Sequence, residues 1–110
     1  MAGYYELKIA SGDHYLWNLK AGNDEIILTS QPYRQRGGAL QDIDSMRHNA
    51  AHDERYQRKI AKGGQFYFVL TAVNGGTIGR SEMQAAEAGC ENGIKSVKAN
   101  SLRALLKEIR

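Results

Sequence analysis

The chain contains two copies of one segment, and this duplication restricts its fold more than any other feature of the sequence. Shifting the sequence by 51 positions aligns residues 5–50 with residues 56–101 without a gap. Fourteen of the 46 aligned positions are identical, whereas unrelated segments of ordinary composition would share about three. The two copies are therefore expected to form the same structural unit twice.

Each copy has the pattern of three short strands. Aromatic and aliphatic side chains alternate with polar ones, which places Tyr15, Trp17 and Leu19 on one buried face. Turns rich in Gly and Asn separate the strands, and they are too short for crossover connections, so each set should form an antiparallel meander. The expected strands cover residues 4–10, 14–20 and 25–30, and then 55–61, the segment around 66–70 and 77–82.

A helix closes each copy. Cys90, Ile94 and Val97 recur at helical spacing, and Ile43 and Met46 hold the equivalent places in the first copy. Three strands and one helix leave too much apolar surface exposed to be stable alone. The sequence therefore predicts an α+β protein in which two tandem βββα repeats form one pseudo-twofold domain, with an antiparallel sheet and two packed helices.

The chain of 110 residues is expected to be a single domain, with repeat one at 4–51, repeat two at 55–101 and a tail at 102–110. In the tail, aliphatic residues at positions i, i+3, i+4 and i+7 predict a short amphipathic helix. A closing strand, by symmetry with residues 55–61, is the alternative. The aliphatic stripe is a candidate surface for a protein partner, and it consists of Leu102, Leu105, Leu106 and Ile109.

Composition places the chain in the cytoplasm. The N-terminus has no basic segment followed by an apolar one, so no secretory signal is visible. No apolar run approaches the roughly 20 residues of a membrane span, so no membrane partner is expected. A single cysteine, Cys90, rules out an internal disulfide. Because a fused pair of repeats satisfies the symmetry of a dimer within one chain, we expect a monomer.

Charge is divided unevenly between the two halves. Residues 1–55 hold 6 basic and 8 acidic side chains, a net −2, whereas residues 56–110 hold 9 and 4, a net +5. This polarity could attract an anion or a nucleic acid, or it could be surface charge without a role. The candidate contacts are Arg80, Lys95, Lys98, Arg103 and Lys107.

Two segments carry a resemblance to a known family: the strand pattern FYFVLTAVNGGTIGRSE, which includes the Ala72-x-Asn74-Gly75 turn, and the helical segment ENGIKSVKANS. Together they resemble the YegP-like family of small bacterial proteins, in its tandem-repeat branch. The resemblance implies a β₃α repeat fold, with exchange of strands between the halves as an option, and it implies no activity. The first copy departs from the pattern with Gln41-Asp42, and the second has Gln84 where the first has Tyr33. A site that needs two equivalent halves is therefore not expected.

No residue set indicates catalysis. His48 and His52 have the spacing of two metal ligands on a helix, with Asp53 or Glu54 nearby, but a third distant ligand is missing. We therefore interpret them as a polar helix end and linker, and Cys90 as a buried structural residue. With no catalytic residue, metal or cofactor indicated, the sequence predicts a small non-catalytic binding or protein-interaction module. The alternative is a nucleic-acid-binding protein that uses the basic second repeat.

Overall fold

The computed structural model describes residues 3–109, in which a unit of three strands and a helix occurs twice and a further strand ends the chain. This arrangement confirms the α+β class and the tandem repeat. The elements are β1 (Tyr4–Ala10), β2 (His14–Lys20), β3 (Ile26–Ser30), α1 (Arg36–Asn49), a 3-10 turn (Asp53–Arg55), β4 (Tyr56–Ile60), β5 (Phe66–Thr71), β6 (Thr77–Arg80), α2 (Glu87–Asn100) and β7 (Leu105–Ile109).

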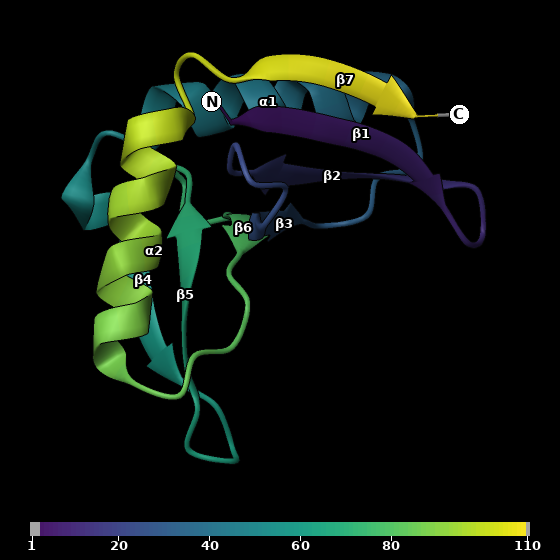
Figure 1. Cartoon of the computed structure of the whole chain (residues 1–110). Helices are drawn as coiled ribbons and strands as arrows, with labels where there is room; N and C mark the ends of the chain where they lie inside the picture. Colours follow the sequence, from purple (N-terminus) through teal and green to yellow (C-terminus); the bar gives the residue numbers. More distant parts are fainter. Residues whose placement is uncertain (1–2, 110) are drawn as a thin grey trace.

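All seven strands belong to one sheet, in the order β4-β5-β6-β3-β2-β1-β7. Each repeat contributes an antiparallel meander, and the two meanders join where β3 pairs with β6, Thr29 opposite Arg80 and Ser30 opposite Gly79. A Cβ atom at Gly79 would lie 2.8 Å from Cδ2 of Leu28, so this junction requires a glycine. In Figure 1, β1 and β2 run across the view and β5 runs down it, so the two halves of the sheet are steeply inclined.

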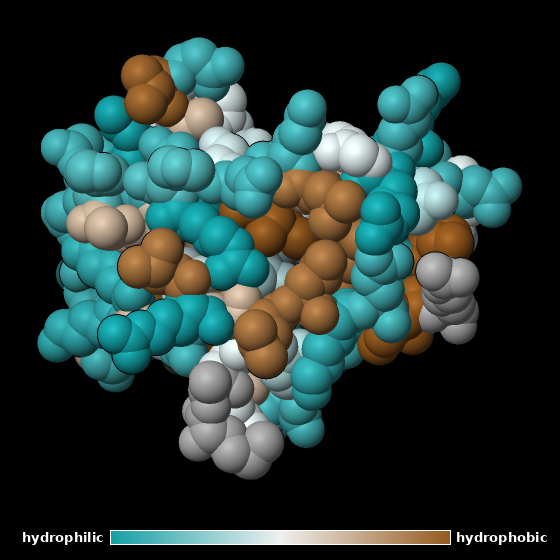
Figure 2. Space-filling model, turned by 90° about the horizontal axis from the view of Figure 1, so that it is seen from above, coloured by the Kyte–Doolittle hydropathy of each residue, from teal (hydrophilic) through white to brown (hydrophobic). Residues whose placement is uncertain are grey.

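The tail is a strand, so the predicted C-terminal helix is wrong. Strand β7 pairs in parallel with β1, from Tyr4 opposite Leu105 to Lys8 opposite Ile109, and this makes the sheet mixed instead of antiparallel. The aliphatic spacing of the tail suits a helix, but β1 offers an open edge whose backbone groups the tail can bond. Figure 2 looks onto this strand from above, and brown aliphatic side chains gather in the middle of the face.

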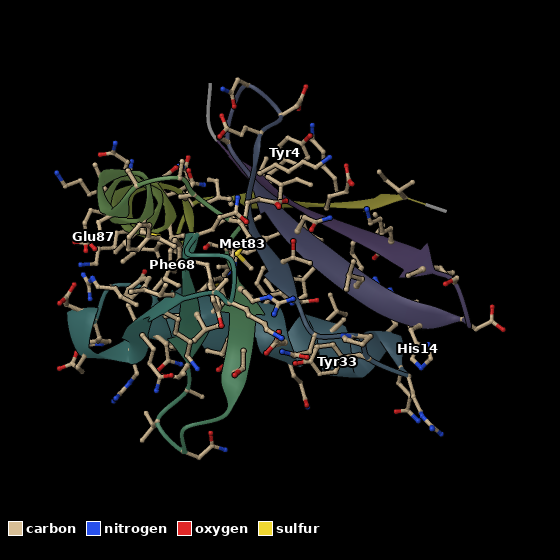
Figure 3. The ribbon with its side chains drawn as sticks, turned by 90° about the horizontal axis from the view of Figure 1, so that it is seen from below. Tyr4, His14, Tyr33, Phe68, Met83 and Glu87 are labelled. Carbon is tan, nitrogen blue, oxygen red and sulfur yellow. The ribbon has the colours of Figure 1, made fainter. Side chains whose placement is uncertain are left out.

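The core lies between the sheet and the two helices and is shared by both repeats. Helix α1 contacts β2 of its own repeat and also β5 and β6, while α2 contacts β5 and β3. Of the predicted buried face, Trp17 and Leu19 are buried, as are Phe68 and Leu70, whereas Tyr15 is partly buried against the edge of the core. Figure 3 shows Phe68 on the side of α2 and Tyr33 beside α1. Neither repeat therefore has a core of its own.

The two helices bury the stripes that the spacing predicts. Cys90, Ile94 and Val97 are buried on α2, and Ile43 and Met46 are buried on α1. Each helix has 14 residues, and neither is long and apolar enough to cross a membrane.

Candidate functional site

The β7 edge of the sheet exposes aliphatic side chains. The stripe that the sequence singles out lies here, on a strand edge and the turn before it instead of on a helix. Figure 2, seen from above, shows a hydrophobic patch with hydrophilic side chains around it. The exposed fractions are 69% for Leu102, 74% for Leu105, 39% for Leu106 and 48% for Ile109. An exposed apolar edge strand is a site for pairing with another chain.

Both charged side chains of β7 are held against the rest of the fold. The Lys107 ammonium lies 4.2 Å from the centre of the Tyr4 ring. The Glu108 carboxylate accepts hydrogen bonds from the Arg36 guanidinium, with Nε 3.1 Å from Oε2 and a second bond from Nη2. These contacts draw charge toward β1 and α1, and they leave the aliphatic side chains to dominate the outer surface.

Arg47 on α1 fixes the turn that leads into β7. Its guanidinium donates hydrogen bonds to the carbonyls of Leu102 and Ala104, at 2.8 and 2.7 Å, and to that of Ser101 at 3.3 Å. The same group lies 4.8 Å from the centre of the buried Tyr5 ring. The β7 edge is thus pre-organised by a side chain from the other repeat, and this lowers the entropy that a binding partner would have to remove.

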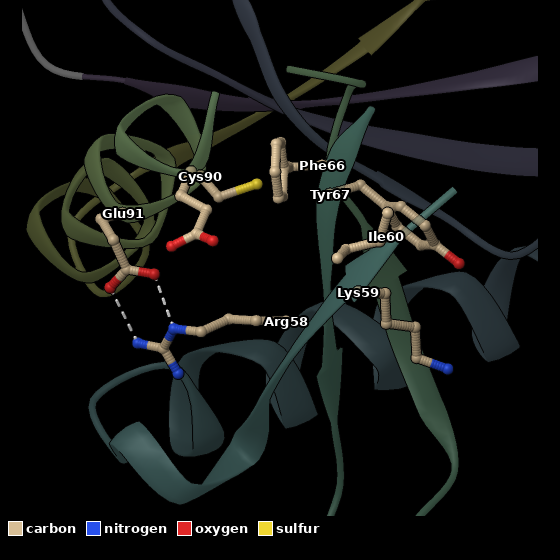
Figure 4. A pocket seen from close by; sticks show the side chains of 8 residues that line it. Arg58, Lys59, Ile60, Phe66, Tyr67, Cys90 and Glu91 are labelled. Atoms are coloured by element: carbon tan, nitrogen blue, oxygen red, sulfur yellow. Dashed lines mark hydrogen bonds and ion pairs between the residues drawn. The ribbon is translucent and has the colours of Figure 1, made fainter. Parts of the chain in front are cut away.

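The opposite edge, β4, is charged. The Arg58 guanidinium bridges to the Glu91 carboxylate on α2, at 2.6 and 3.0 Å (Figure 4). It also lies 3.5 Å from the Asp53 carboxylate. Lys98 also bonds Asp53, at 3.0 Å. The Lys98 contact lowers the pKa of Asp53, and the Arg58 bond lowers the pKa of Glu91. A cavity of about 240 Å³ opens beside this network, and Cys90 and Phe66 form part of its wall.

The corresponding strands β1 and β4 differ because β7 covers only β1. Arg58 and Glu91 stand where the first repeat has Leu7 and Leu40. Leu7 is 2% exposed, since β7 lies beside it. Within residues 3–109 no strand lies outside β4, and charged side chains replace the leucines there, as expected of an edge that avoids pairing. The outer strand β4 therefore carries a charged network beside exposed Ile60, whereas the outer strand β7 exposes Leu105 and Ile109.

The basic residues predicted to contact an anion come from four parts of the fold. Arg80 is on β6, Lys95 and Lys98 are on α2, Arg103 is in the turn before β7, and Lys107 is on β7. The Arg80 guanidinium lies 5.9 Å from the centre of the Tyr67 ring. Lys98 belongs to the β4 network and Lys107 covers Tyr4, so the structure does not gather the five into one cluster.

His48 and His52 do not share a helix face. Helix α1 ends at Asn49, so His52 lies in the following turn, with Nδ1 3.6 Å from the Glu54 carboxylate. His48 Nδ1 lies 2.8 Å from the Asp44 carbonyl. In the described part of the chain, no three His, Cys, Asp or Glu side chains are grouped to hold a metal. Cys90 is buried, and burial raises the pKa of its thiol, which disfavours the reactive thiolate.

Asp42 carries a half-buried carboxylate that the sequence does not single out. The indole Nε1–H of Trp17 donates to its Oδ2 at 2.9 Å. Burial raises the pKa of Asp42 to about 6, although the neighbouring Tyr33 and Trp17 side chains lower it. The only signal in the sequence is that Gln41-Asp42 and Tyr33 are positions at which the two copies differ.

A family model described as "Domain of unknown function (DUF1508)" matches residues 10–57 and 61–108. The chain belongs to the DUF1508 family. Each match contains two strands, a helix and at least the beginning of the strand that follows it, so β4 and β7 are corresponding elements of two DUF1508 units. The resemblance to the YegP-like family is confirmed.

Relatives of this DUF1508 protein cover nearly its whole length. A UPF0339 protein of Bordetella pertussis is 52% identical over 108 residues, which is 98% of this chain and 96% of the relative. The solution NMR structure of YegP from Escherichia coli is 44% identical with a TM-score of 0.93, over 98% of this chain and 93% of that chain. The solution NMR structure of a UPF0339 protein from Shewanella oneidensis is 42% identical with a TM-score of 0.92, over 98% and 92%.

Proposed function

We propose that this DUF1508 protein is a non-catalytic interaction module that binds a protein partner through the β7 edge. The observation that carries the proposal is the set of exposed aliphatic side chains on an edge strand whose charged side chains are bound within the chain. The partner adds an extended segment to β7, so that backbone hydrogen bonds provide affinity and the aliphatic side chains provide specificity.

The contrast between the two edges supports this proposal. The β4 edge carries the Arg58–Glu91 ion pair, which discourages strand addition. The β7 edge exposes Leu105 and Ile109, its own ion pair between Arg36 and Glu108 points back toward α1, and Arg47 holds the turn before it in place. We further propose that the partner is cytoplasmic, because the one thiol, on Cys90, suits a reducing compartment.

The test is a capture experiment with the immobilised full-length chain, followed by quantitative mass spectrometry of the bound proteins. The variant Leu102→Ser with Leu105→Ser removes two highly exposed side chains of the β7 edge. Its matched control is Val73→Ser with Ile60→Ser, which removes aliphatic side chains that are 78% and 68% exposed elsewhere.

Partners retained by wild type and by the control should be lost by the β7 variant, with affinity reduced about tenfold or more, as expected when anchor side chains are removed. Both changes lie at exposed positions, so the variant should remain folded. If the β7 variant and the control retain the same proteins equally, binding through this edge is ruled out.

The second candidate function is nucleic-acid binding by the basic second repeat, favoured by the net charge of +5 on residues 56–110. Among the basic candidates, Lys95 and Arg103 are exposed and form no ion pair or ring contact within residues 3–109. Binding to DNA or RNA should weaken steeply as salt rises, and Lys95→Gln with Arg103→Gln should reduce the salt dependence. Absence of binding at low salt removes this candidate.

A further inference from the structure

One corner of the fold is filled in the first repeat and hollow in the second. In the first repeat Trp17, Asp42 and Tyr33 occupy the space between β2, the segment after β3 and α1, where the carboxylate accepts the indole N–H. Fifty-one positions later the second repeat has smaller residues at all three places, and these are Phe68, Gly93 and Gln84.

The smaller residues line a cavity of about 270 Å³. Its other wall is the β2–β3 hairpin of the first repeat, with Glu25 and Ile26. Strands β3 and β6 are antiparallel, with Thr29 opposite Arg80. The start of β3 and the hairpin before it therefore lie beside the segment that follows β6. The cavity therefore lies across the junction of the two repeats, on the α2 side where Figure 3 shows Phe68.

The lining combines an apolar wall with an acidic rim. Ile26 and the buried Phe68 form the apolar part of the lining, and exposed Glu25 and Glu82 supply carboxylates. Glu25 Oε2 lies 3.5 Å from Asn23 Nδ2, a weak contact that leaves the carboxylate other acceptor sites. Amides and hydroxyls complete the polar lining, from Gln84, Asn92, Ser81 and Ser96, and no Lys or Arg is among the lining residues.

We propose that this corner binds a small organic amine. The protonated amino group lies at the rim beside the carboxylates of Glu25 and Glu82, and the apolar body lies against Phe68 and Ile26. Charge excludes an organic anion, because no cationic side chain lines the cavity. The site is separate from the β7 edge, so it stands whether or not a protein binds there. In the first repeat Asp42 and Tyr33 fill the equivalent space, so only the second repeat offers the site.

The probe is 2-phenylethylamine, titrated into the ¹⁵N-labelled full-length chain while backbone amide shifts are recorded. Phenylacetate, which is similar in size and opposite in charge, is the matched probe. The amine should shift the amides of Gly93, Ser96 and Ile27 along a saturating curve with a Kd of about 1 mM, in keeping with its few heavy atoms. Phenylacetate should leave these amides unshifted.

Two kinds of variant test the assignment. Glu25→Gln with Glu82→Gln removes the charge without changing size, and should raise the Kd at least tenfold. Gln84→Tyr introduces the residue of the first repeat and should abolish binding by filling the cavity. A tyrosine fits over Gly89 as Tyr33 fits over Gly38, where an added Cβ would lie 3.2 Å from the Tyr33 ring.

The control is Glu54→Gln, an exposed carboxylate outside the cavity, which should leave binding unchanged. Three results would each overturn the proposal: no saturating shift with the amine, equal shifts with phenylacetate, or unchanged affinity after Glu25→Gln with Glu82→Gln. The first two use the wild-type chain and the third changes only exposed residues, so none of them requires Gln84→Tyr to fold.

Discussion

Tyr5 and Tyr56 hold the two repeats together by crossed hydrogen bonds. The Tyr5 hydroxyl donates to the Ser101 carbonyl at 2.8 Å, and the Tyr56 hydroxyl donates to the Ala50 carbonyl at 2.6 Å. Each carbonyl belongs to the residue that caps the helix of the other repeat. Burial raises the pKa of both phenols, so both remain donors at neutral pH. The duplicated tyrosines therefore stabilise the pair of repeats.

Removing either hydroxyl should destabilise the whole chain. Tyr5→Phe and Tyr56→Phe each leave a helix-capping carbonyl without this donor, and each should lower the free energy of unfolding by about 1 to 2 kcal/mol. Urea unfolding followed by circular dichroism measures the change. Because the core is shared, the transition should remain single. Two separate transitions, one for each repeat, would contradict this.

Asp42 should make stability depend on pH. Its pKa rises from 3.8 to about 6 in the folded chain, so the folded state holds this proton more tightly than the unfolded state. Its stabilising contribution is fully present below pH 3.8 and is lost as the pH rises through about 6. Asp42→Asn keeps an acceptor for Trp17. It should remove the part of the pH dependence of the free energy of unfolding that Asp42 causes.

The measurement is the free energy of unfolding by urea at several pH values for wild type and Asp42→Asn. Asp44→Asn, at an exposed position on the same helix, is the control and should keep the wild-type slope. Identical slopes for wild type and Asp42→Asn would show that burial does not raise the pKa of Asp42.

The charged network on β4 should prevent self-association. Arg58→Leu with Glu91→Leu places the residues of the first repeat, Leu7 and Leu40, on β4, which is an outermost strand of the sheet formed by residues 3–109. Sedimentation velocity should then show oligomers that increase with concentration. Arg34→Leu, at an exposed position in the loop before α1, is the control and should stay as wild type. If the double variant sediments as a monomer like the wild type, the charged network does not prevent self-association.

Arg47 should hold β7 in place. Arg47→Met removes the hydrogen bonds to the carbonyls of Leu102 and Ala104 while keeping much of the side-chain volume. Amide hydrogen exchange in β7 should become about tenfold faster or more, because local opening no longer breaks charge-assisted bonds. Exchange in β5, on the other side of the sheet, serves as the internal reference. Unchanged protection of β7 would show that pairing with β1 suffices.

The sequence predicts the local elements well because their signals are local. Alternation places Trp17 and Phe68 in the core, and helical spacing places Ile43 and Ile94 there. The prediction for the tail is wrong because its aliphatic spacing fits a helix, whereas a long-range contact with the open edge of β1 determines its structure. The spacing of aliphatic residues within the nine-residue tail carries no information on which strand of the sheet has an unpaired edge.

The candidate site is predicted in part. The stripe that includes Leu105 is exposed, although on a strand and not on a helix. The hollow corner of the second repeat depends on Gly93 and Gln84, where the copies visibly differ. The sequence shows those differences, but only the fold shows that they meet at one place. The β4 network was not predicted, because Arg58 and Glu91 lie far apart in the sequence.

Binding of a protein partner along β7 is best tested by amide hydrogen exchange of the full-length chain with a captured partner. Protection should appear in Leu105–Ile109 and in the turn before it, with β4 and the exposed face of α2 unchanged. Protection over α2 and β6, where Lys95 and Arg80 lie, with β7 still exchanging freely, would contradict it.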